Sequence, residues 1–287
     1  MESTLPKEEK QVQYFSKDFE YEDHLKQESE KLSHLLDKLS LKEYSLDQQM
    51  EIQQIAQESW DEFYKNNQDK FFKNRNYLSF AFDLITKHIE DNQDKEEKLY
   101  LFEVGSGTGN TIVPLHDKYN SVMRFYACDF SQNAVQLLDN LKICEKAFVK
   151  DMVKGDLVEI DDDKLDFVTM IFFLSAIHPS EHPQVINKIA QKMKKGGSIL
   201  FRDYGAYDLA MMRFINKKKG IIDLDKMIFQ RGDKTLACFF TIEKLVEVMG
   251  QNGFECVQQE YCTIENKNIK RNLVMRRVFI NAIFQKQ

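Results

Sequence analysis

A run of alternating strand-like and helix-like segments, starting at Leu99, constrains the fold of this 287-residue chain more than any other feature. The first segment, "LYLFEVG" (99–105), is apolar and ends in glycine, as is typical of a buried strand that leads into a turn. Further strands are predicted at 123–129, 146–152, within 165–177 and at 198–204, with helices at 110–119, 131–141 and 182–193. Such crossover units predict an α/β fold, in which helices cover both faces of a parallel sheet.

The end of the chain departs from this rhythm. A helix is predicted at 241–253, and two strands follow it with no helix between them, "FECVQQEYCTI" and "RRVFINAIFQ". They predict an antiparallel hairpin that completes a seven-stranded, mostly parallel sheet. This is the arrangement of Rossmann-like class I methyltransferases, and we expect residues 99–287 to form such a domain, with an insertion at 205–240.

Two segments precede this domain. Residues 1–44 are rich in Glu, Gln, Lys and Ser, and their leucines recur at roughly helical spacing, which predicts a peripheral amphipathic arm. The arm could dock on the body of the protein or on a protein partner, or it could stay frayed. Residues 45–98 are predicted to be a helical extension, with Ser45 or Ser59 as N-cap and the charged linker "DNQDKEEK" at the end.

Charge and composition limit the class of protein. The net charge is −6, but residues 192–287 carry a net charge of +8, which could create a positive surface for a polyanion; an exposed lysine-rich surface without a partner is the alternative. The five cysteines form no C-x-x-C pair and the six histidines show no metal-ligand spacing, so we expect no disulfide framework and no metal. No apolar run reaches membrane-spanning length and the first residues show no targeting signal, so we expect a cytoplasmic protein, with the nucleus as the alternative.

The sharpest chemical signal is "EVGSGTGN" (103–110), in the turn after the first predicted strand. Gly105, Gly107 and Gly109 allow a tight turn and let a ligand approach the backbone closely. Dinucleotide enzymes usually show G-x-G-x-x-G, whereas here the spacing is G-x-G-x-G after Glu103. A carboxylate at that place would repel a pyrophosphate but could pair with the cationic part of S-adenosylmethionine. A plain strand-to-helix turn is the alternative.

Two acidic residues follow at the ends of the next two predicted strands. Asp129 ends the second strand, where a carboxylate can accept hydrogen bonds from both ribose hydroxyls. Asp151 lies at the end of the third strand, where a carboxylate could accept a hydrogen bond from the adenine amino group. Each residue alone could be a helix cap or a surface residue. Together with the glycine loop, they predict an S-adenosylmethionine site spread over three strand ends.

Several longer motifs are more specific than these general features, and by them the chain resembles the tRNA 3-methylcytidine (m3C) methyltransferases over about residues 45–285. The motifs are "WDEFYKNNQDKFFKNR", "EVGSGTGN", "YACDFS", "KDMVKGDL", "IFFLSAIHP", "LFRDYGAYDLAMMRF" and "RRVF". The resemblance implies methyl transfer from S-adenosylmethionine to N3 of a cytidine in a tRNA anticodon loop. It implies cofactor contacts at Trp60, Tyr64, Gly105, Asp129, Asp151 and Ile171. From the glycine loop itself we add Glu103 and Gly107 to the residues expected to bind the cofactor.

The segment "GDKTLACFF" (232–240) departs from the family pattern. The family generally has Asp-Gly-Thr-Arg followed by Tyr-Phe-Phe, and here Leu236 replaces the arginine and Cys238 replaces the tyrosine. If that arginine contacts RNA in the family, RNA binding is altered in this chain. The family's glycine loop usually has cysteine at the position of Ser106, which is a mild change.

Three residues are candidates for the chemistry. Cytosine N3 already has a lone pair in the plane of the ring, so methyl transfer needs positioning rather than a strong base. Positive charge develops on the base, so a nearby carboxylate would stabilise the transition state, and our candidate is Asp203 at the end of the fifth strand. Arg202 could grip a phosphate or order the loop; an internal Arg–Asp pair that fixes the turn is the alternative. His178 could hydrogen-bond the base or act as a structural cap before Pro179.

Phosphate contacts are expected from basic residues in three parts of the chain. The candidates are Lys70, Lys73 and Arg75; Lys217, Lys218 and Lys219; and Lys270, Arg271, Arg276 and Arg277. Arg277 could instead be a structural residue of the last strand. For Met211, Met212 and Phe214, a place in the core of the insertion is favoured over a base-stacking platform.

The aromatic-rich segment 59–78 lies just ahead of the first strand of the sheet. Trp60 and Tyr64 are four residues apart and share one face of a helix, so they could close over the adenosine end of the cofactor as a lid. Phe71 and Phe72 would then anchor the segment to the body. Simple packing of Trp60 into the core is the alternative.

Two classes of function remain open on the sequence. The first is the tRNA methyltransferase that the resemblance implies, with tRNA as partner. The second is a methyltransferase-fold subunit with a structural role in a larger assembly, weakly active or idle, which the N-terminal arm and the altered 232–240 segment favour. A methyltransferase acting on a small molecule or a protein is a further alternative, which the basic last third of the chain disfavours.

Overall fold

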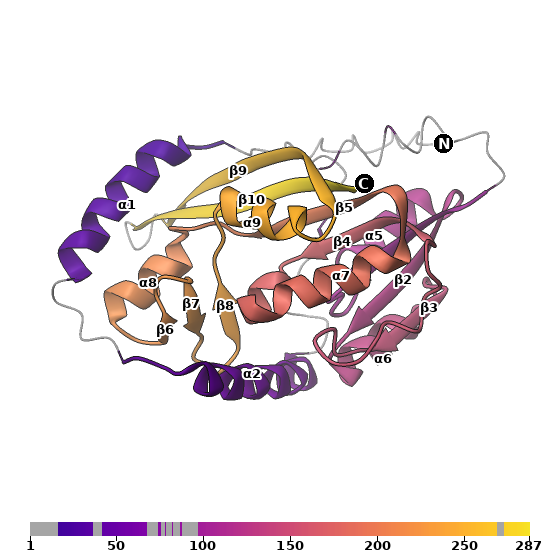
Figure 1. Ribbon diagram of the computed structural model, residues 1–287, viewed down its shortest axis with the longest axis horizontal. Coiled ribbons are helices and arrows are strands. Elements are labelled where there is room, and N and C mark those ends of the chain that lie inside the picture. Colours follow the sequence, from indigo (N-terminus) through magenta and orange to yellow (C-terminus); the bar gives the residue numbers. More distant parts are fainter. Residues whose placement is uncertain are drawn as a thin grey trace, which may run out of the picture.

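A seven-stranded sheet forms the centre of the protein (Figure 1). The computed structural model describes residues 17–36, 42–67, 74–75, 78, 82, 87, 97–268 and 273–287. The strand order is β3-β2-β1-β4-β5-β10-β9. The strands are β1 (Leu99–Val104), β2 (Met123–Asp129), β3 (Lys146–Val149), β4 (Leu165–Ile171), β5 (Met193–Tyr204), β9 (Phe254–Asn268) and β10 (Leu273–Lys286). The first five are parallel, and β10 is antiparallel to both β5 and β9, so the predicted fold is confirmed.

Alternate residues of the strands enter two cores, one on each face of the sheet. In β1, Phe102 and Val104 point into one core and Leu101 into the other. The first core is covered by α7 (His182–Lys192) and α9 (Ile242–Gly250). The second is covered by α5 (Ile112–Tyr119). β1, β2 and β4 are mostly apolar because most of their residues are buried between the two cores.

The terminal hairpin is longer than the sequence pattern predicts. The pairing of β9 with β10 continues past the predicted strands as far as Asn268 and Leu273, through residues that include the charged Glu265, Lys267 and Arg276. Lys17 also forms a parallel bridge to Thr263, so the start of the described chain adds to the edge of β9. Backbone pairing therefore carries the hairpin past the end of its apolar core.

Residues between β5 and α9 form a separate layer beside the main sheet. It contains α8 (Leu209–Lys217) and a three-stranded sheet of β6 (Ile221–Asp223), β7 (Ile228–Gln230) and β8 (Leu236–Cys238). The two ends of this layer meet, because Gly205 and Phe240 form a bridge. Met211 and Met212 are buried in its core, as the sequence pattern favours.

The N-terminal arm docks on this layer. Leu32 and Leu35 of α1 (Tyr21–Leu36) pack on the core that contains α8. Tyr21 stacks on Tyr261 of β9, with ring centroids 3.5 Å apart, and His24 Nε2 lies 3.0 Å from the carbonyl oxygen of Tyr207. Of the three alternatives left open by the sequence, the structure shows docking on the body for residues 17–36.

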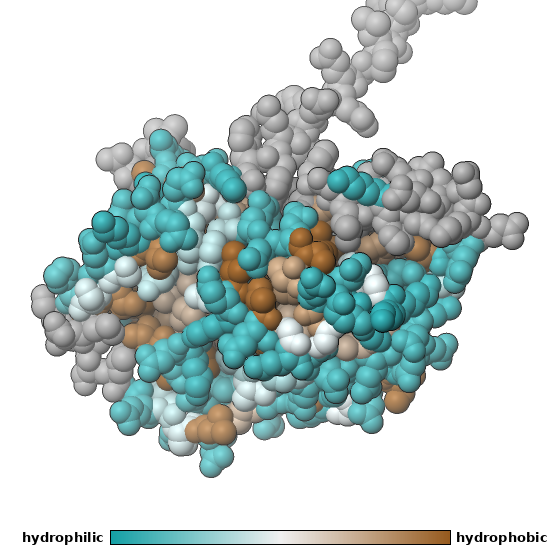
Figure 2. All heavy atoms as spheres, turned by 45° about the horizontal axis from the view of Figure 1, so that its top comes forward, coloured by the Kyte–Doolittle hydropathy of each residue, from teal (hydrophilic) through white to brown (hydrophobic). Residues whose placement is uncertain are grey.

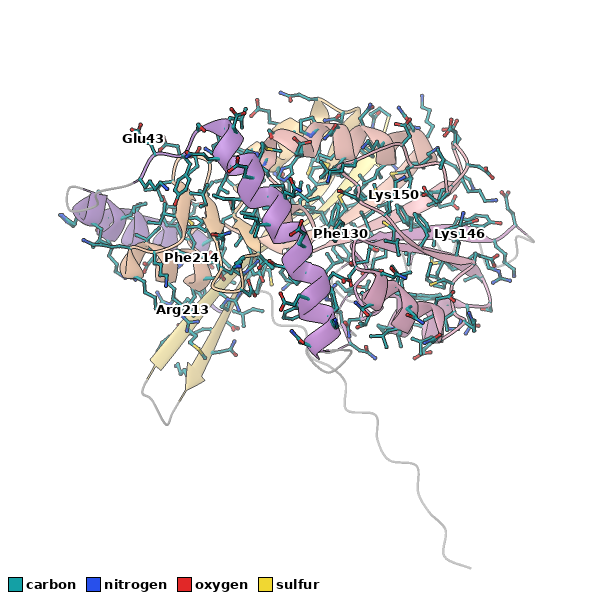
Figure 3. All side chains as sticks on the ribbon, turned by 90° about the horizontal axis from the view of Figure 1, so that it is seen from below. Glu43, Phe130, Lys146, Lys150, Arg213 and Phe214 are labelled. Atoms are coloured by element: carbon teal, nitrogen blue, oxygen red, sulfur yellow. The ribbon has the colours of Figure 1, made fainter. Side chains whose placement is uncertain are left out.

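Helix α2 (Leu46–Asn67) runs along the edge of the sheet where the parallel strands end (Figure 1). It begins at a reciprocal cap, in which Gln48 N donates to Ser45 Oγ and Ser45 N donates to Gln48 Oε1. Ser59 lies within the helix and donates to the carbonyl oxygen of Ile55, so Ser45 is the N-cap. Seen from below, α2 crosses in front of the sheet, between the layer that carries Phe214 and the strand ends near Phe130 (Figure 3).

Figure 2 shows a mainly hydrophilic face on which apolar side chains gather only in small groups. Among the helices in the described part of the chain, none is both long and apolar enough to cross a membrane.

Candidate active site

The glycine loop between β1 and α5 approaches two aromatic side chains closely. Gly105 has a φ of +67°, and a Cβ there would lie 2.6 Å from Cδ2 of Phe173. Gly107 has a φ of +53°, and a Cβ there would lie 2.5 Å from the hydroxyl of Tyr64. Only glycine fits these two positions, because both the left-handed backbone and the space exclude a side chain.

A cavity of about 680 Å³, which we call the glycine-loop cavity, opens beside this loop. This volume includes the solvent at its mouth. The cavity brings together five of the residues predicted to bind the cofactor: Trp60, Tyr64, Gly105, Asp129 and Asp151.

The two acidic residues of this cavity are held by backbone N–H groups. Asp129 accepts from Gly107 N at 2.7 Å and from Ser131 N at 2.9 Å. Burial raises the pKa of its carboxyl group, against these hydrogen bonds. Asp151 Oδ1 accepts from Val153 N at 2.9 Å. Both carboxylates are thereby fixed in direction at the wall of the cavity.

Trp60 and Tyr64 lie together over the cavity, with ring centroids 6.1 Å apart and planes at 29°. Burial raises the pKa of the Tyr64 hydroxyl, which keeps it neutral. The indole Nε1–H of Trp60 is buried and has no acceptor among the described residues. A buried donor that lines a cavity is satisfied when a ligand supplies the acceptor.

Asp61, the residue after Trp60, ties α2 to the start of α6 (Gln132–Asp139). Ser131 Oγ donates to Asp61 Oδ1 at 2.6 Å, and Asn133 Nδ2 donates to the same carboxylate. The hydrogen bond from Ser131 lowers the pKa of Asp61. Ser131 is also the N-cap of α6, accepting from Ala134 N. One polar cluster therefore fixes the helix that carries Trp60 against the strand end that carries Asp129.

These residues fit S-adenosylmethionine. Gly105 leaves room for a ligand against the backbone, Asp129 and Asp151 supply acceptors at two successive strand ends, and the Trp60 indole supplies an unused donor. The cavity is also lined by the apolar side chains of Phe130, Met152, Val153, Phe173 and Ile177. A flat base can pack between such walls.

Glu103 lies behind the loop and is 1% exposed. Its Oε1 is 3.9 Å from Nη1 of Arg75. Burial raises the pKa of Glu103 to about 7, although the Arg75 guanidinium acts in the opposite direction. Glu103 is not among the residues that line the glycine-loop cavity. The sequence predicted that this carboxylate would pair with the cationic part of the cofactor, whereas the structure places it behind the loop and next to Arg75.

Arg75 was expected to face RNA on the outer surface, and the structure places it inside the site. Its Nη1 donates to Thr111 Oγ1 at 3.0 Å, its N donates to the carbonyl oxygen of Asn110, and its guanidinium lies 5.5 Å from the ring centre of Phe172. This position lies next to the glycine loop because Asn110 and Thr111 follow directly on that loop.

Arg75 borders a second cavity of about 730 Å³, which we call the arginine cavity. It shares part of its wall with the glycine-loop cavity, namely Trp60, Tyr64, Gly105, Phe172 and Ala176. The rest of its wall comprises Arg75, Ser106, Asn110, Ile171, Ser175, Tyr204 and Arg231. Ile171 thus lies at the arginine cavity and not at the glycine-loop cavity.

Asp203 lies one layer behind the arginine cavity and is 0% exposed. Its Oδ2 accepts from Ser175 N at 2.9 Å, and its Oδ1 accepts from Tyr204 N at 2.9 Å. Burial raises the pKa of Asp203 to about 6, although the hydrogen bonds from Ser175 act in the opposite direction. Ser175 and Tyr204, not Asp203, line the cavity.

Arg202 is buried against β10, the strand next to β5. Its Nη1 donates to Asn281 Oδ1 of β10, and its guanidinium lies 4.7 Å from the ring centre of Phe279. With 3% of its surface exposed, it contradicts the expectation that it grips a phosphate, because a polyanion cannot reach it. Arg202 and Asp203 are neighbours on a strand, so their side chains point to opposite faces.

His178 takes the structural alternative that the sequence left open. Its ring Nδ1 accepts from Ser180 N, its Nε2 lies 2.8 Å from Gln49 Oε1, and its N donates to Gln53 Oε1. Burial lowers its pKa, so the ring is neutral at pH 7. It lines neither cavity and anchors α2 to the end of β4.

The other basic candidates are dispersed. Arg277 pairs with the buried Asp208 at 2.8 Å, which fits its structural alternative, and Arg276 pairs with Glu265 at 3.1 Å. Lys217, Lys218 and Lys219 lie at the end of α8 and are exposed. The residues outside the described part of the chain are Lys70, Phe71, Phe72, Lys73, Lys270 and Arg271. No group of three or more His, Cys, Asp or Glu that could hold a metal occurs among the described residues.

Sequence reasoning missed several residues that line the two cavities. Phe130 and Met152 each follow directly on one of the predicted acidic residues, and Gln53 precedes Trp60 by seven residues, on the same face of α2. Proximity to a strand end or to a predicted helix face could have identified them. Tyr204 likewise follows directly on the predicted Asp203 at the end of β5. Arg231 had no such signal, because the insertion brings it to the arginine cavity through tertiary contacts.

Comparisons with known proteins agree with this geometry. The family described as "Methyltransferase domain" matches residues 64–259. The chain is 36% identical to tRNA N(3)-cytidine methyltransferase METTL6 of Homo sapiens over 243 residues, which cover 83% of each chain. It is 37% identical to tRNA N(3)-methylcytidine methyltransferase trm140 of Schizosaccharomyces pombe, covering 79% of this chain and 73% of that one.

The fold is shared with more distant solved structures. The 1,6-didemethyltoxoflavin-N1-methyltransferase of Burkholderia thailandensis, solved with S-adenosylhomocysteine, superposes with a TM-score of 0.58 at 13% identity and covers 87% of this chain and 95% of that one. A SAM-dependent methyltransferase of Methanosarcina mazei superposes with a TM-score of 0.53 at 17% identity, covering 69% and 96%.

The two departures in the 232–240 segment lie in the core. Leu236 and Cys238, which replace an arginine and a tyrosine of the family pattern, are each 1% exposed. Cys238 donates to the carbonyl oxygen of Ile177. Neither position can present a side chain to solvent in this chain. The predicted cofactor, S-adenosylmethionine, is confirmed by the methyltransferase domain and fold. On the identity and coverage of its curated relatives, the chain belongs to the family of tRNA N(3)-cytidine methyltransferases.

Proposed function

We propose that this protein transfers a methyl group from S-adenosylmethionine to N3 of a cytidine in a tRNA anticodon loop. The observation that carries the proposal is the pair of cavities that share one wall. The glycine-loop cavity holds the acceptors for a nucleoside-type cofactor, and the arginine cavity opens beside it. A donor in the first and a base in the second would meet at the shared wall of Gly105, Phe172 and Ala176.

The arginine cavity suits a base that has left its stack. The Phe172 and Tyr204 rings, 5.0 Å apart at 49°, supply aromatic surface, and Phe172 has a φ of +57°, a conformation rare for a residue with a side chain. Backbone strain of this kind concentrates at functional sites. Recognition of a single unstacked base relies on aromatic surfaces and edge hydrogen bonds.

The chemistry asks the protein for orientation and for stabilisation of positive charge. The N3 lone pair attacks the sulfonium methyl, the bond between sulfur and methyl breaks, and the positive charge passes from sulfur to the base. Ser175, whose N–H is held by Asp203, lies on the wall of the arginine cavity and can orient the edge of the base. Asp203 contributes a negative charge one layer behind it and acts as a positioning residue.

The finer assignments follow from this scheme. Trp60 and Tyr64 close the cofactor site, residues 45–98 serve as a lid and RNA-docking segment, and residues 99–287 form the catalytic domain. The tRNA contacts are assigned to basic residues around the arginine cavity and the insertion, and residues 1–44 remain candidates for a protein partner through surfaces that do not face the body. A tRNA substrate is consistent with a protein of the cytoplasm or the nucleus.

The test is direct. The purified full-length chain is incubated with S-adenosylmethionine and unmodified tRNA, and the nucleosides are analysed by mass spectrometry. We expect 3-methylcytidine from the native chain and none from Asp129→Ala, which removes the ribose acceptor. Asp139→Ala, a surface change on α6, serves as the matched control.

Calorimetry with S-adenosylmethionine separates the possible failures. Cofactor binding without any methylated cytidine would point to a different substrate. Absence of cofactor binding would overturn the proposal and favour a structural role in a larger assembly.

A further inference from the structure

A third cavity lies on the insertion, and we propose that it binds the phosphodiester backbone of the single-stranded RNA next to the target cytidine. This inference rests on the proposed function. The cavity has a volume of about 1370 Å³, including the solvent at its mouth, and we call it the insertion groove. It is lined by Tyr44, Ala210, Arg213, Phe214, Lys217, Lys219, Gly220, Ile222, Gln230, Arg231, Gly232 and Lys234.

Five of these twelve side chains are cationic, and none of the twelve carries a carboxylate. The cations are Arg213, Lys217, Lys219, Arg231 and Lys234. A concave surface lined by one sign of charge focuses the electrostatic potential and attracts a polyanion. The overall charge of −6 does not oppose this, because the potential at a surface depends on the nearest charges.

The fold itself brings these cations together. Arg213 and Lys217 are four residues apart, so they share one face of α8. Lys218 ends the helix in a left-handed conformation, with a φ of +52°, and the chain turns so that Lys219 also lines the groove. Arg231 and Lys234 come from the turn between β7 and β8, on the other side of the groove.

The groove also presents aromatic surface. Phe214 stacks on Phe229, with ring centroids 5.0 Å apart and planes at 19°, and Tyr44 lines the groove ahead of α2. Figure 3 shows Arg213 and Phe214 next to each other on the insertion. Cationic grooves with aromatic side chains are the common solution for binding single strands, because the cations follow the phosphates and the rings receive bases.

Arg231 connects the groove to the catalytic centre, because it lines both the insertion groove and the arginine cavity. Its guanidinium lies 5.7 Å from the ring centre of Tyr204, and it donates to Thr235 Oγ1 and to the carbonyl oxygen of Leu236. The side chain is thus oriented by its own hairpin. An RNA strand that enters the arginine cavity with one base passes Arg231 and continues along the groove.

A fluorescein-labelled 12-nucleotide RNA of uridines with one central cytidine tests the groove by fluorescence anisotropy over a range of salt concentrations. The groove variant is Lys217→Gln/Lys219→Gln. The control is Lys142→Gln/Lys195→Gln, which removes the same charge at the opposite edge of the sheet, where Lys142 precedes β3 and Lys195 lies at the start of β5. Unfolding temperature and cofactor affinity are measured for each variant to confirm that it is folded.

We expect the groove variant to bind RNA on the order of tenfold more weakly, with the slope of log K against log salt reduced by about 1.4 for two lost phosphate contacts. For methyl transfer to tRNA, KM rises while kcat changes little. The control variant keeps the native slope.

Equal salt slopes for the groove and control variants would overturn the proposal, as would a native chain that does not bind this RNA. If RNA binding depends on the groove but the chain makes no 3-methylcytidine, the groove is still an RNA-binding site and the proposed function is overturned instead.

Discussion

The backbone N–H of Ser175 donates to Oδ2 of Asp203 at 2.9 Å, which joins the turn after β4 to the end of β5. Asp203 is fully buried, whereas Ser175 lines the arginine cavity. The carboxylate therefore acts on the cavity through its neighbour. Asp203, which the sequence suggested for direct contact with the base, is therefore a residue that positions Ser175.

Asp203→Asn is expected to lower kcat by about 10- to 100-fold with little change in cofactor affinity. The amide has one accepting oxygen in place of two, so Ser175 N or Tyr204 N faces an N–H₂ group, at a cost of about 1–3 kcal/mol. Single-turnover methylation and calorimetry with S-adenosylmethionine measure the two effects. Asp163→Asn, on the exposed turn before β4, is the control.

A purely structural role for Asp203 predicts a different result. The unfolding temperature would fall while kcat of the folded fraction stayed native. Unchanged turnover with intact cofactor binding would remove Asp203 from the mechanism.

The residues that line the glycine-loop cavity could largely be predicted from the sequence, because their positions follow from the pattern of strands and helices. Gly105, Asp129 and Asp151 lie at the ends of strands that the apolar pattern identifies, and parallel strands bring their carboxyl ends to one edge. Trp60 and Tyr64 share a helix face, and the resemblance implied that this face meets the cofactor.

The residues that line the arginine cavity could not be predicted in the same way. Arg202, Asp203 and His178 lie at strand ends as predicted, but their side chains are turned into the interior by neighbours far along the chain, such as Asn281 and Gln49. Arg231 reaches the site from an insertion whose core packs against Leu32 and Leu35 of α1. Sequence spacing reports which strand end a residue occupies, not the face on which tertiary contacts place its side chain.

Trp60→Ala is expected to weaken binding of S-adenosylmethionine by about tenfold or more. The change removes an aromatic wall of the glycine-loop cavity and the buried indole donor, losses that together amount to about 1.5–3 kcal/mol. Calorimetry measures the affinity. Ile55→Ala, an exposed position on the same helix, controls for a change in helix stability. An affinity equal to that of the native chain would exclude the lid.

Glu103→Gln is expected to remove part of the pH dependence of stability. Because the folded-state pKa of Glu103 is raised to about 7 from an ordinary 4.5, the folded state holds this proton more tightly. Its contribution to stability is present below about pH 4.5 and is lost as the pH rises through 7. The shift corresponds to an effect on the order of 3 kcal/mol.

Thermal unfolding of the native chain and of Glu103→Gln between pH 4.5 and 8 tests this. The native chain should lose stability relative to the variant as the pH rises across that window. Glu62→Gln, on the exposed face of α2, should follow the native curve. Parallel curves for the native chain and Glu103→Gln would show that the carboxylate is ionised in the folded state through its contact with Arg75.

Lys218→Gly is expected to stabilise the insertion. Lys218 is the C-cap of α8 and has a φ of +52°, a left-handed conformation that costs a residue with a Cβ about 1 kcal/mol and costs glycine little. The unfolding temperature should rise by about 2–4 °C if the insertion unfolds with the rest of the chain. Lys217→Gly removes the same charge inside the helix, where glycine costs about 1 kcal/mol, so its unfolding temperature should fall. Differential scanning calorimetry of the two variants decides between this account and a simple charge effect, because a charge effect would shift both temperatures in the same direction.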